Sequence, residues 1–293
     1  MMTTATEKRQ RLRERLAAPG MLTAPGIFDM ISARMADRMG FDVLYMTGYG
    51  TVASYLGLPD AGLATYTDML NRASAFALGT QTPIIADGDT GYGGLLNVAH
   101  TVKGYEAGGL AGIQLEDQEF PKKCGHTPGR RVIPASDMVK KIRVAAEARN
   151  SDDFLIVART DARTSLGLDE ALSRMHAYSE AGADILFVES PESVQEMEQI
   201  AGAFDKPVLI NIVEGGKTPV LSREQLQAMG FRLAIYPGTA FLAMGKALED
   251  AYSALLQDGS SAAVADRLYD FESFSRLMGF QAVWDFDKAH ADD

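Results

Sequence analysis

The chain has 293 residues, a formal net charge of −11 and 46% hydrophobic residues. An acidic chain whose basic residues cluster no further than pairs such as Arg130-Arg131 is unsuited to binding nucleic acid or an anionic membrane surface. Its single cysteine excludes an internal disulfide, and the charged N-terminal run 7–11 leads us to expect neither a signal peptide nor a membrane anchor there. We therefore expect a cytoplasmic protein, built as one large α/β barrel or as two smaller domains.

Short apolar runs rich in β-branched residues recur along the chain and are typical of buried strands. Eight such runs lie at 22–24, 43–46, 84–87, 112–115, 155–158, 185–188, 208–210 and 233–236. A longer stretch with apolar residues at helical spacing follows each of them. These stretches cover 30–39, 67–78, 96–107, 136–148, 168–181, 193–203, 222–229 and 240–256.

Eight strand–helix units predict a closed parallel (β/α)8 TIM barrel rather than an open doubly wound sheet. No G-x-G-x-x-G follows the first strand and no Walker pattern occurs, so nothing predicts a nucleotide cofactor. We interpret residues 1–293 as a single barrel domain, with 258–293 as a C-terminal helical extension that contains a helix over 262–277. Aromatic residues crowd this extension, and we expect them to pack on another subunit of an oligomer: Phe271, Phe274, Phe280, Trp284 and Phe286.

Polar residues follow six consecutive predicted strands, at the barrel end where catalytic groups gather. Asp87, Asp89 and Glu116, together with Glu189, would place several carboxylates around one mouth. Like charges at close range repel unless a hard cation balances them, so we expect Mg²⁺, with Mn²⁺ as the alternative. An Asp-Gly-Asp alone is more often a turn or a helix cap, and the coincidence of several strand ends favours the metal.

The segment Lys122-Lys123-Cys124-Gly125-His126 follows the fourth predicted strand and holds the only cysteine. Its lysines would stabilise a thiolate and Gly125 would let the backbone bend around an anion, so the segment suits proton transfer. A single cysteine is commonly a buried apolar residue, which the cationic neighbours disfavour. His126 is either an acid–base group or a hydrogen-bonding residue that stabilises the loop.

Arg159, at the end of the fifth predicted strand, also has two interpretations. It neutralises Glu189 or Asp161 in a buried pair, or its guanidinium clamps a substrate carboxylate. Its position among carboxylates at the barrel rim favours the clamp.

Several motifs resemble those of the isocitrate lyase and phosphoenolpyruvate mutase superfamily. The segment 122–126 resembles the K-[KR]-C-G-H signature of its lyase branch, and 87–93 (DGDTGYG) is similar to D-x-D-x-G-[FY]-G. Residues 115–118, 158–162 and 213–219 add to a resemblance that runs from Pro25 to about Leu255. It implies a (β/α)8 barrel whose eighth helix is exchanged with a neighbouring subunit, in a dimer or a homotetramer.

The resemblance also implies roles for the residues at the strand ends. Asp87 would bind Mg²⁺ directly, and Asp89 and Glu116 directly or through water. Cys124 would be the catalytic acid on a mobile gating loop of 118–132 that also carries Lys122, Gly125 and His126. The candidate base is Tyr45, and the residues implied to hold the substrate oxygens are Thr47, Gly48, Tyr49, Arg159, Glu189 and Asn211.

The implied activity is Mg²⁺-dependent cleavage of a carbon–carbon bond in a 2-hydroxy di- or tricarboxylate. A base removes the hydroxyl proton, a 2-oxo acid leaves, and Cys124 protonates the resulting carbanion. In 2-methylisocitrate lyases an arginine follows the eighth strand in Y-P-x-x-x-F-R, where this chain has Leu242. This difference favours a 2-alkylmalate or 2,3-dimethylmalate over methylisocitrate, which another basic residue could still accommodate.

Two other activities of the superfamily compete with this one. Residues 46–51 and 56–60 also resemble carboxyphosphonoenolpyruvate-type phosphonomutases, and oxaloacetate hydrolysis or decarboxylation would need no cysteine acid. A non-enzymatic dicarboxylate binder would need neither the acid nor the metal, so the combined carboxylates, thiol and Arg159 disfavour it.

Overall fold

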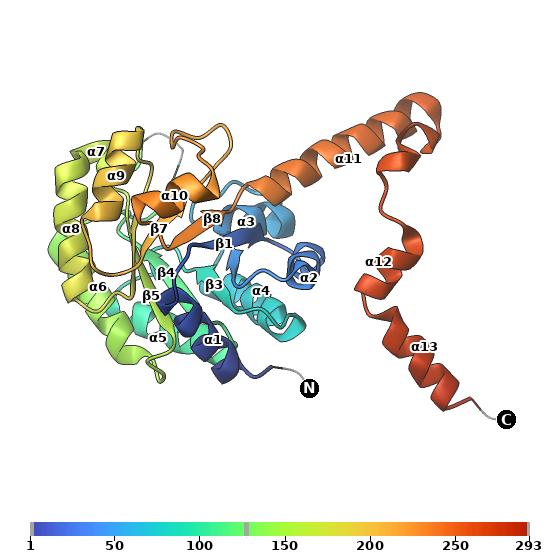
Figure 1. Ribbon diagram of the computed structural model, residues 1–293, viewed down its shortest axis with the longest axis horizontal. Helices are drawn as coiled ribbons and strands as arrows, with labels where there is room; N and C mark the ends of the chain where they lie inside the picture. The colour runs from blue at the N-terminus through green and yellow to red at the C-terminus, as the bar shows by residue number, and fades with distance from the viewer. Residues whose placement is uncertain (1–2, 126–128, 292–293) are drawn as a thin grey trace. The chain divides into compact units, whose positions relative to one another are not determined.

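A computed structural model describes residues 3–125 and 129–291 of the chain. These residues divide into two compact units, Met1–Thr239 and Ala240–Asp293, each described by itself below. The first unit contains a ring of strands surrounded by helices (Figure 1). It holds every residue predicted for the functional site that the structure describes.

Eight parallel strands close into a barrel in chain order, because β8 pairs with β1. The predicted (β/α)8 barrel is therefore confirmed. Strand β5 continues past its apolar run because the polar residues Arg159 and Thr160 still pair with β6. The strands are β1 (Leu22–Ile27), β2 (Leu44–Met46), β3 (Ile84–Asp87), β4 (Gly112–Glu116), β5 (Leu155–Thr160), β6 (Ile185–Val188), β7 (Val208–Asn211) and β8 (Leu233–Tyr236).

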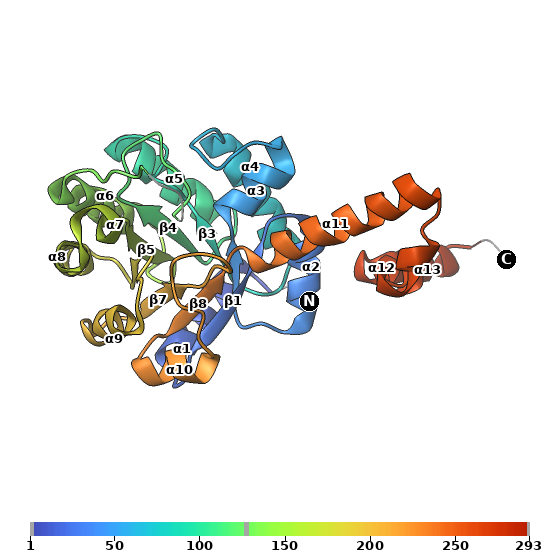
Figure 2. The same ribbon diagram turned by 90° about the horizontal axis from the view of Figure 1, so that it is seen from above.

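A helix follows each strand, as predicted. The helices of the first unit surround the strands in Figure 2. The predicted helices of the first unit correspond to α2 (Met30–Met39), α4 (Tyr66–Gly79), α5 (Leu95–Ala107), α6 (Ala135–Ala148), α8 (Leu168–Glu180), α9 (Val194–Gly202) and α10 (Arg223–Met229). Three further helices were not among the eight expected: α1 (Ala5–Ala17), α3 (Gly48–Leu56) and α7 (Ala162–Leu166). Helix α3 has ordinary boundary signals, since Thr47 caps its N-terminus and Gly57 adopts a φ of 63° after its last residue.

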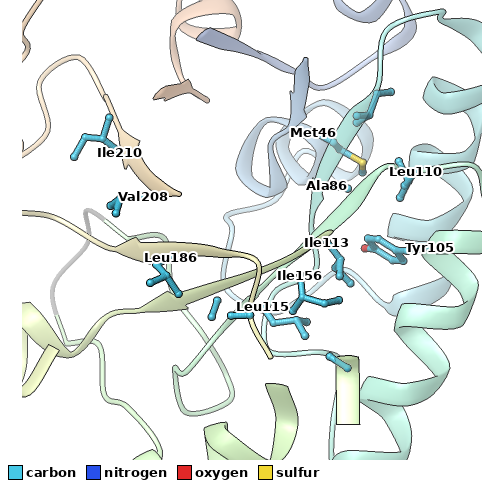
Figure 3. Packing of buried hydrophobic residues seen from close by; sticks show 14 of the residues in the cluster. Met46, Ala86, Tyr105, Leu110, Ile113, Leu115, Ile156, Leu186, Val208 and Ile210 are labelled. Carbon is cyan, nitrogen blue, oxygen red and sulfur yellow. The ribbon is translucent and has the colours of Figure 1, made fainter. Parts of the chain in front are cut away.

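Alternate residues of most strands belong to two separate apolar clusters. The outer cluster packs between strands and helices, and Figure 3 shows Met46, Ile113 and Tyr105 within it. The inner cluster fills the barrel, and Leu12 and Leu16 of α1 belong to it. Helix α1 therefore closes the barrel end where the strands begin, which leaves the opposite end for the polar residues.

The second unit begins within α11 (Thr239–Asp258) and continues with η1 (Ala262–Arg267), α12 (Phe271–Leu277) and α13 (Phe280–Ala289). The single helix expected over 262–277 is wrong, because the chain breaks at 268–270, where Asp270 caps α12. Phe271, Trp284 and Phe286 are exposed in the chain by itself, and their packing on another subunit stays a prediction. Within the described parts of the chain, no helix has the length and apolar character to cross a membrane.

Candidate active site at the carboxyl ends of the strands

The predicted polar residues share the strand positions that face the barrel interior. In β3 the inner-cluster residue Ile85 is followed two residues later by Asp87, and in β5 Val157 is followed by Arg159. Because side chains alternate between the two faces of a strand, each polar residue continues the inward row. The same spacing holds for Glu189 after Phe187 and Asn211 after Leu209. The site is therefore the polar top layer of the barrel interior.

Asp87 and Asp89 form an acidic group, and a lysine pairs with the Asp89 carboxylate. The Asp89 N–H donates to Asp87 Oδ1 at 3.0 Å, and Asp89 has a φ of 48° that tightens this turn. The Lys122 ammonium lies 2.7 Å from Asp89 Oδ1 and also pairs with Asp60. Burial raises the pKa of Asp89 to about 7, with the Lys122 ammonium opposing and Asp87 adding to the shift. The acidic group thus carries more negative charge than one lysine balances.

Lys122 is a fixed cation in this structure. Its burial alone would lower the pKa of its ammonium, but the surrounding carboxylates, Asp89 and Asp60 first, raise that pKa above its usual range. A permanently protonated lysine cannot accept a proton, so Lys122 can act catalytically only through its charge and its N–H groups. We expected both lysines to stabilise the thiolate. In the structure the Lys123 ammonium donates a hydrogen bond to Gly129 O at 3.3 Å.

Glu116 carries a buried oxygen with no hydrogen-bond partner among the residues that the structure describes. This oxygen is Oε1, while the other carboxylate oxygen, Oε2, lies 3.5 Å from Arg159 Nε. Burial raises the pKa of Glu116 well above its usual range, although Arg159 opposes the shift. Gln114, also on β4, accepts a hydrogen bond at 2.9 Å from the Tyr45 hydroxyl, while its own Nε2 has no partner within residues 3–125 and 129–291. Unpaired buried polar atoms on this wall of the barrel indicate a site that a ligand completes.

These residues fit a hard cation that keeps water in its coordination shell. Within residues 3–125 and 129–291, no three His, Cys, Asp or Glu side chains are arranged to hold one ion directly. Mg²⁺ commonly uses one or two carboxylates plus waters and substrate oxygens. The unpartnered Oε1 of Glu116 and the raised pKa values of Asp87 and Asp89 match such an ion, because added positive charge would offset the cost of ionising these buried carboxylates.

Tyr45 is a fully buried phenol at the end of β2. Burial raises its pKa well above the usual value, and the Asp87 carboxylate raises it further. The phenol is therefore held in its neutral form, in which it donates to Gln114. The predicted role of Tyr45 as a base requires nearby positive charge to offset both effects.

The carboxylate of Asp87 also lies against the first turn of α3. A Cβ placed on Gly48 would approach Asp87 Oδ2 to 2.5 Å, so only glycine allows this contact. Thr47 and Gly48 are buried and Tyr49 is exposed on the same turn. Backbone N–H groups and the positive end of the helix dipole at this turn favour anions. Of the three predicted carboxylate-binding residues, Gly48 thus lies against the acidic group, and Thr47 and Tyr49 flank it in the chain.

Arg159 pairs with three carboxylates. Its Nε and Nη2 each donate at 2.9 Å to Asp161, and Nη2 lies 3.3 Å from Glu189 Oε2. Asn211 Nδ2 donates to the same Glu189 oxygen at 3.1 Å. The interpretation of Arg159 as a neutralising partner therefore holds for both Asp161 and Glu189. Its position beside Glu116 also leaves it in reach of a ligand bound there.

The cysteine segment folds onto Arg159 and Glu189. A Cβ on Gly125 would approach Arg159 Nη2 to 2.4 Å and Glu189 Oε2 to 2.9 Å. Ser190 Oγ donates to Gly125 O at 3.0 Å, which fixes the segment there. Cys124 precedes this contact and is half-buried. His126, predicted as part of the site, lies outside the described residues.

Two residues of this site were missed from the sequence. Asp60 precedes α4 on a loop, yet its side chain is only 7% exposed and pairs with Lys122. Arg130, which follows the cysteine segment in the chain, pairs with the buried Asp161. Both come from loops with no periodicity, so only a Leu-Pro-Asp turn and a basic pair could have drawn attention to them.

Comparisons with known proteins show which family this chain belongs to. The sequence model for phosphoenolpyruvate phosphomutase matches residues 12–256. The chain is 47% identical to 2,3-dimethylmalate lyase of Eubacterium barkeri, covering 96% of this chain and 97% of the relative. It is 40% identical to 2-methylisocitrate lyase of Aeropyrum pernix, covering 96% and 89%.

Two solved structures are similar over nearly their whole length. Oxaloacetate acetylhydrolase with the inhibitor 3,3-difluorooxalacetate has a TM-score of 0.92 and 34% identity, covering 98% of each chain. Phosphonopyruvate hydrolase with oxalate and Mg²⁺ has a TM-score of 0.87 and 28% identity, covering 99% of this chain and 100% of the other. The chain therefore belongs to the phosphoenolpyruvate phosphomutase family of the isocitrate lyase and PEP mutase superfamily.

Proposed function

We propose that this protein is a Mg²⁺-dependent lyase that cleaves a carbon–carbon bond of a 2-hydroxy dicarboxylate, of the 2-alkylmalate or 2,3-dimethylmalate type. One observation carries the proposal: the backbone of Gly125, next to Cys124, lies directly on the Arg159–Glu189 pair beside the acidic group. This contact supports a role for the adjacent Cys124, whose thiol would act where the substrate oxygens bind. The 47% identity to a 2,3-dimethylmalate lyase and Leu242 in place of an arginine support the substrate class.

The acidic group would hold the metal. Asp87, Asp89 and Glu116 supply the carboxylates, with waters and substrate oxygens as the other ligands. When bound, Mg²⁺ supplies positive charge that polarises the substrate hydroxyl and offsets the raised pKa values of the surrounding acids. The similar phosphonopyruvate hydrolase was solved with Mg²⁺ and oxalate, which supports this assignment.

The remaining residues orient the substrate. The first turn of α3, with Thr47, Gly48 and Tyr49, offers backbone N–H groups to one carboxylate. Arg159 pairs with Glu189, which accepts a hydrogen bond from Asn211, and would bind the second carboxylate. Holding both ends keeps the bond to be cleaved in one orientation, which is a large part of what positioning can contribute.

Proton transfer accounts for the rest of the reaction. Tyr45 would take the proton of the substrate hydroxyl; the C2–C3 bond then breaks, and its electron pair moves to C3 while a 2-oxo acid forms. Cys124 would donate its thiol proton to C3, which gives the carboxylate product. A loop of 118–132 that closes over the site, as in the family resemblance, would exclude water from the carbanion.

The test is an assay of the purified protein with Mg²⁺ against 2-alkylmalates, 2,3-dimethylmalate, methylisocitrate, oxaloacetate and phosphonopyruvate. Release of a 2-oxo acid is the readout for the hydroxy acids, and loss of the substrate is the readout for oxaloacetate and the phosphonate. We expect turnover of a hydroxy acid and its loss with EDTA. Oxaloacetate hydrolysis is the second candidate, because the structure with a TM-score of 0.92 is an oxaloacetate acetylhydrolase. Turnover of oxaloacetate or a phosphonate alone would refute the lyase assignment.

The acid is tested in D₂O. Wild-type protein should place one deuterium, on one face, at the α-carbon of the carboxylate product, which derives from C3 of the substrate, and Cys124→Ser should slow product formation by about 10²–10⁴-fold. Because serine keeps the shape but is a far weaker acid, folding and Mg²⁺ binding should be unchanged. An unaltered rate in Cys124→Ser would show that the thiol is not the proton donor.

A further inference from the structure

Asp161 is a buried carboxylate shared by two arginines. It receives two hydrogen bonds of 2.9 Å from Arg159 and pairs with Arg130 Nη1, and its side chain is fully buried. A carboxylate can accept several charge-assisted hydrogen bonds, so both guanidinium groups act on it together. The two arginines lower the pKa of Asp161 against the effect of its burial, which keeps it ionised.

Arg130 is built into this position rather than lying on the surface. Its side chain is 2% exposed, and its Nη2 donates to Thr164 Oγ1 at 2.7 Å. The neighbouring Arg131 provides the contrast, because its side chain is 81% exposed and pairs with Glu119 at 2.7 Å. Of two adjacent arginines, one is therefore committed to the buried network and one faces solvent.

The backbone of Asp161 is held from behind. Asp117 accepts hydrogen bonds from the Asp161 N–H at 2.9 Å and from Thr160 Oγ1 at 2.7 Å. Asp117 is itself anchored by Tyr178 at 2.8 Å and Arg174 at 3.2 Å. The base of the Asp161 side chain is thus fixed, and the balance between its two cations decides where its carboxylate sits.

We propose that Arg130 and Asp161 are positioning residues that set the orientation of Arg159. The Arg159 guanidinium is attracted by Asp161 on one side and by Glu189, at 3.3 Å, on the other. Arg130 takes up part of the Asp161 charge and so leaves Arg159 available to Glu189 and to the substrate. The inference rests on the proposed function only in that Arg159 binds a substrate carboxylate.

Removing Arg130 should draw Arg159 toward Asp161 and away from the substrate. We expect Arg130→Met to lower kcat/KM by roughly 10- to 100-fold, mainly by raising KM. A displacement of about 1 Å in a group that positions the substrate can lower the rate by up to about 100-fold. Arg130→Lys, which keeps the charge without the bidentate fork, should recover part of the loss. Arg131→Met is the matched control and should stay within about 2-fold of wild type.

Two further backgrounds separate positioning from a direct role. When Arg130→Met is added to Asp161→Asn or to Arg159→Met, it should have little further effect on kcat/KM. In both backgrounds the Asp161 contact through which Arg130 acts on Arg159 is already lost. An equal loss in all backgrounds would overturn the proposal. So would equal effects of Arg130→Met and Arg131→Met.

Urea unfolding needs no substrate, so it tests the shared carboxylate independently of the proposed activity. In urea unfolding, Arg130→Met and Arg159→Met together should destabilise the protein by more than the sum of the single changes, since both partners of Asp161 are then lost. This coupling should vanish with Asp161→Asn. If the double variant does not fold, Arg130→Lys and Arg159→Lys serve in the same cycle. Additive effects with Asp161 present would refute the shared carboxylate even if the lyase activity is confirmed.

Discussion

The acidic group makes a quantitative prediction about stability and pH. The Asp89 carboxyl has an ordinary pKa of 3.8 in the unfolded chain and about 7 in the folded protein, chiefly because of its burial. The folded state therefore binds this proton more tightly, so the free energy of unfolding falls as pH rises from about 4 to 7. At 1.36 kcal/mol per pH unit, a difference of about three units corresponds to roughly 4 kcal/mol.

The assay is urea unfolding at intervals between pH 4 and 8, on wild type and on Asp89→Asn, whose amide has no proton to release. We expect wild type to lose stability relative to the variant across this range. Mg²⁺ should restore it, and more strongly at pH 8 than at pH 5, because the ion binds the charged carboxylate. Parallel pH–stability curves for the two proteins would show that the pKa of Asp89 is not raised and would refute the reasoning.

Three further changes test other parts of the site. Gly125→Ala places a Cβ 2.4 Å from Arg159 Nη2 and should lower kcat/KM by up to about 10²-fold, whereas Gly202→Ala, with open space around it, should be silent in steady-state kinetics. Lys122→Met strips two buried carboxylates of their cation and should cost about 3–5 kcal/mol in urea unfolding. Tyr45→Phe should lower kcat by about 10²–10⁴-fold if the phenol is the base, with at most about 1–3 kcal/mol lost in stability; a retained kcat contradicts that role.

Much of the barrel could be predicted from the sequence because its signals are local. Apolar runs bounded by polar residues marked the eight strands, and helical spacing marked the intervening helices. The polar positions followed from the same periodicity, since Asp87 and Arg159 continue the inward rows of Ile85 and Val157. Because all strands of a parallel barrel end at one rim, residues far apart in sequence could be assigned to one site before their distances were known.

Only the tertiary structure decided which charges meet within that site. Asp60 and Arg130 lie on loops without periodicity, and nothing local indicates that one pairs with Lys122 and the other with Asp161. The choice depends on how the loops pack over the barrel mouth, where burial makes an unpaired charge costly and so selects the partners. The sequence by itself thus determined the barrel and its polar rim, while the packing of the loops determined the ion pairs that orient Arg159.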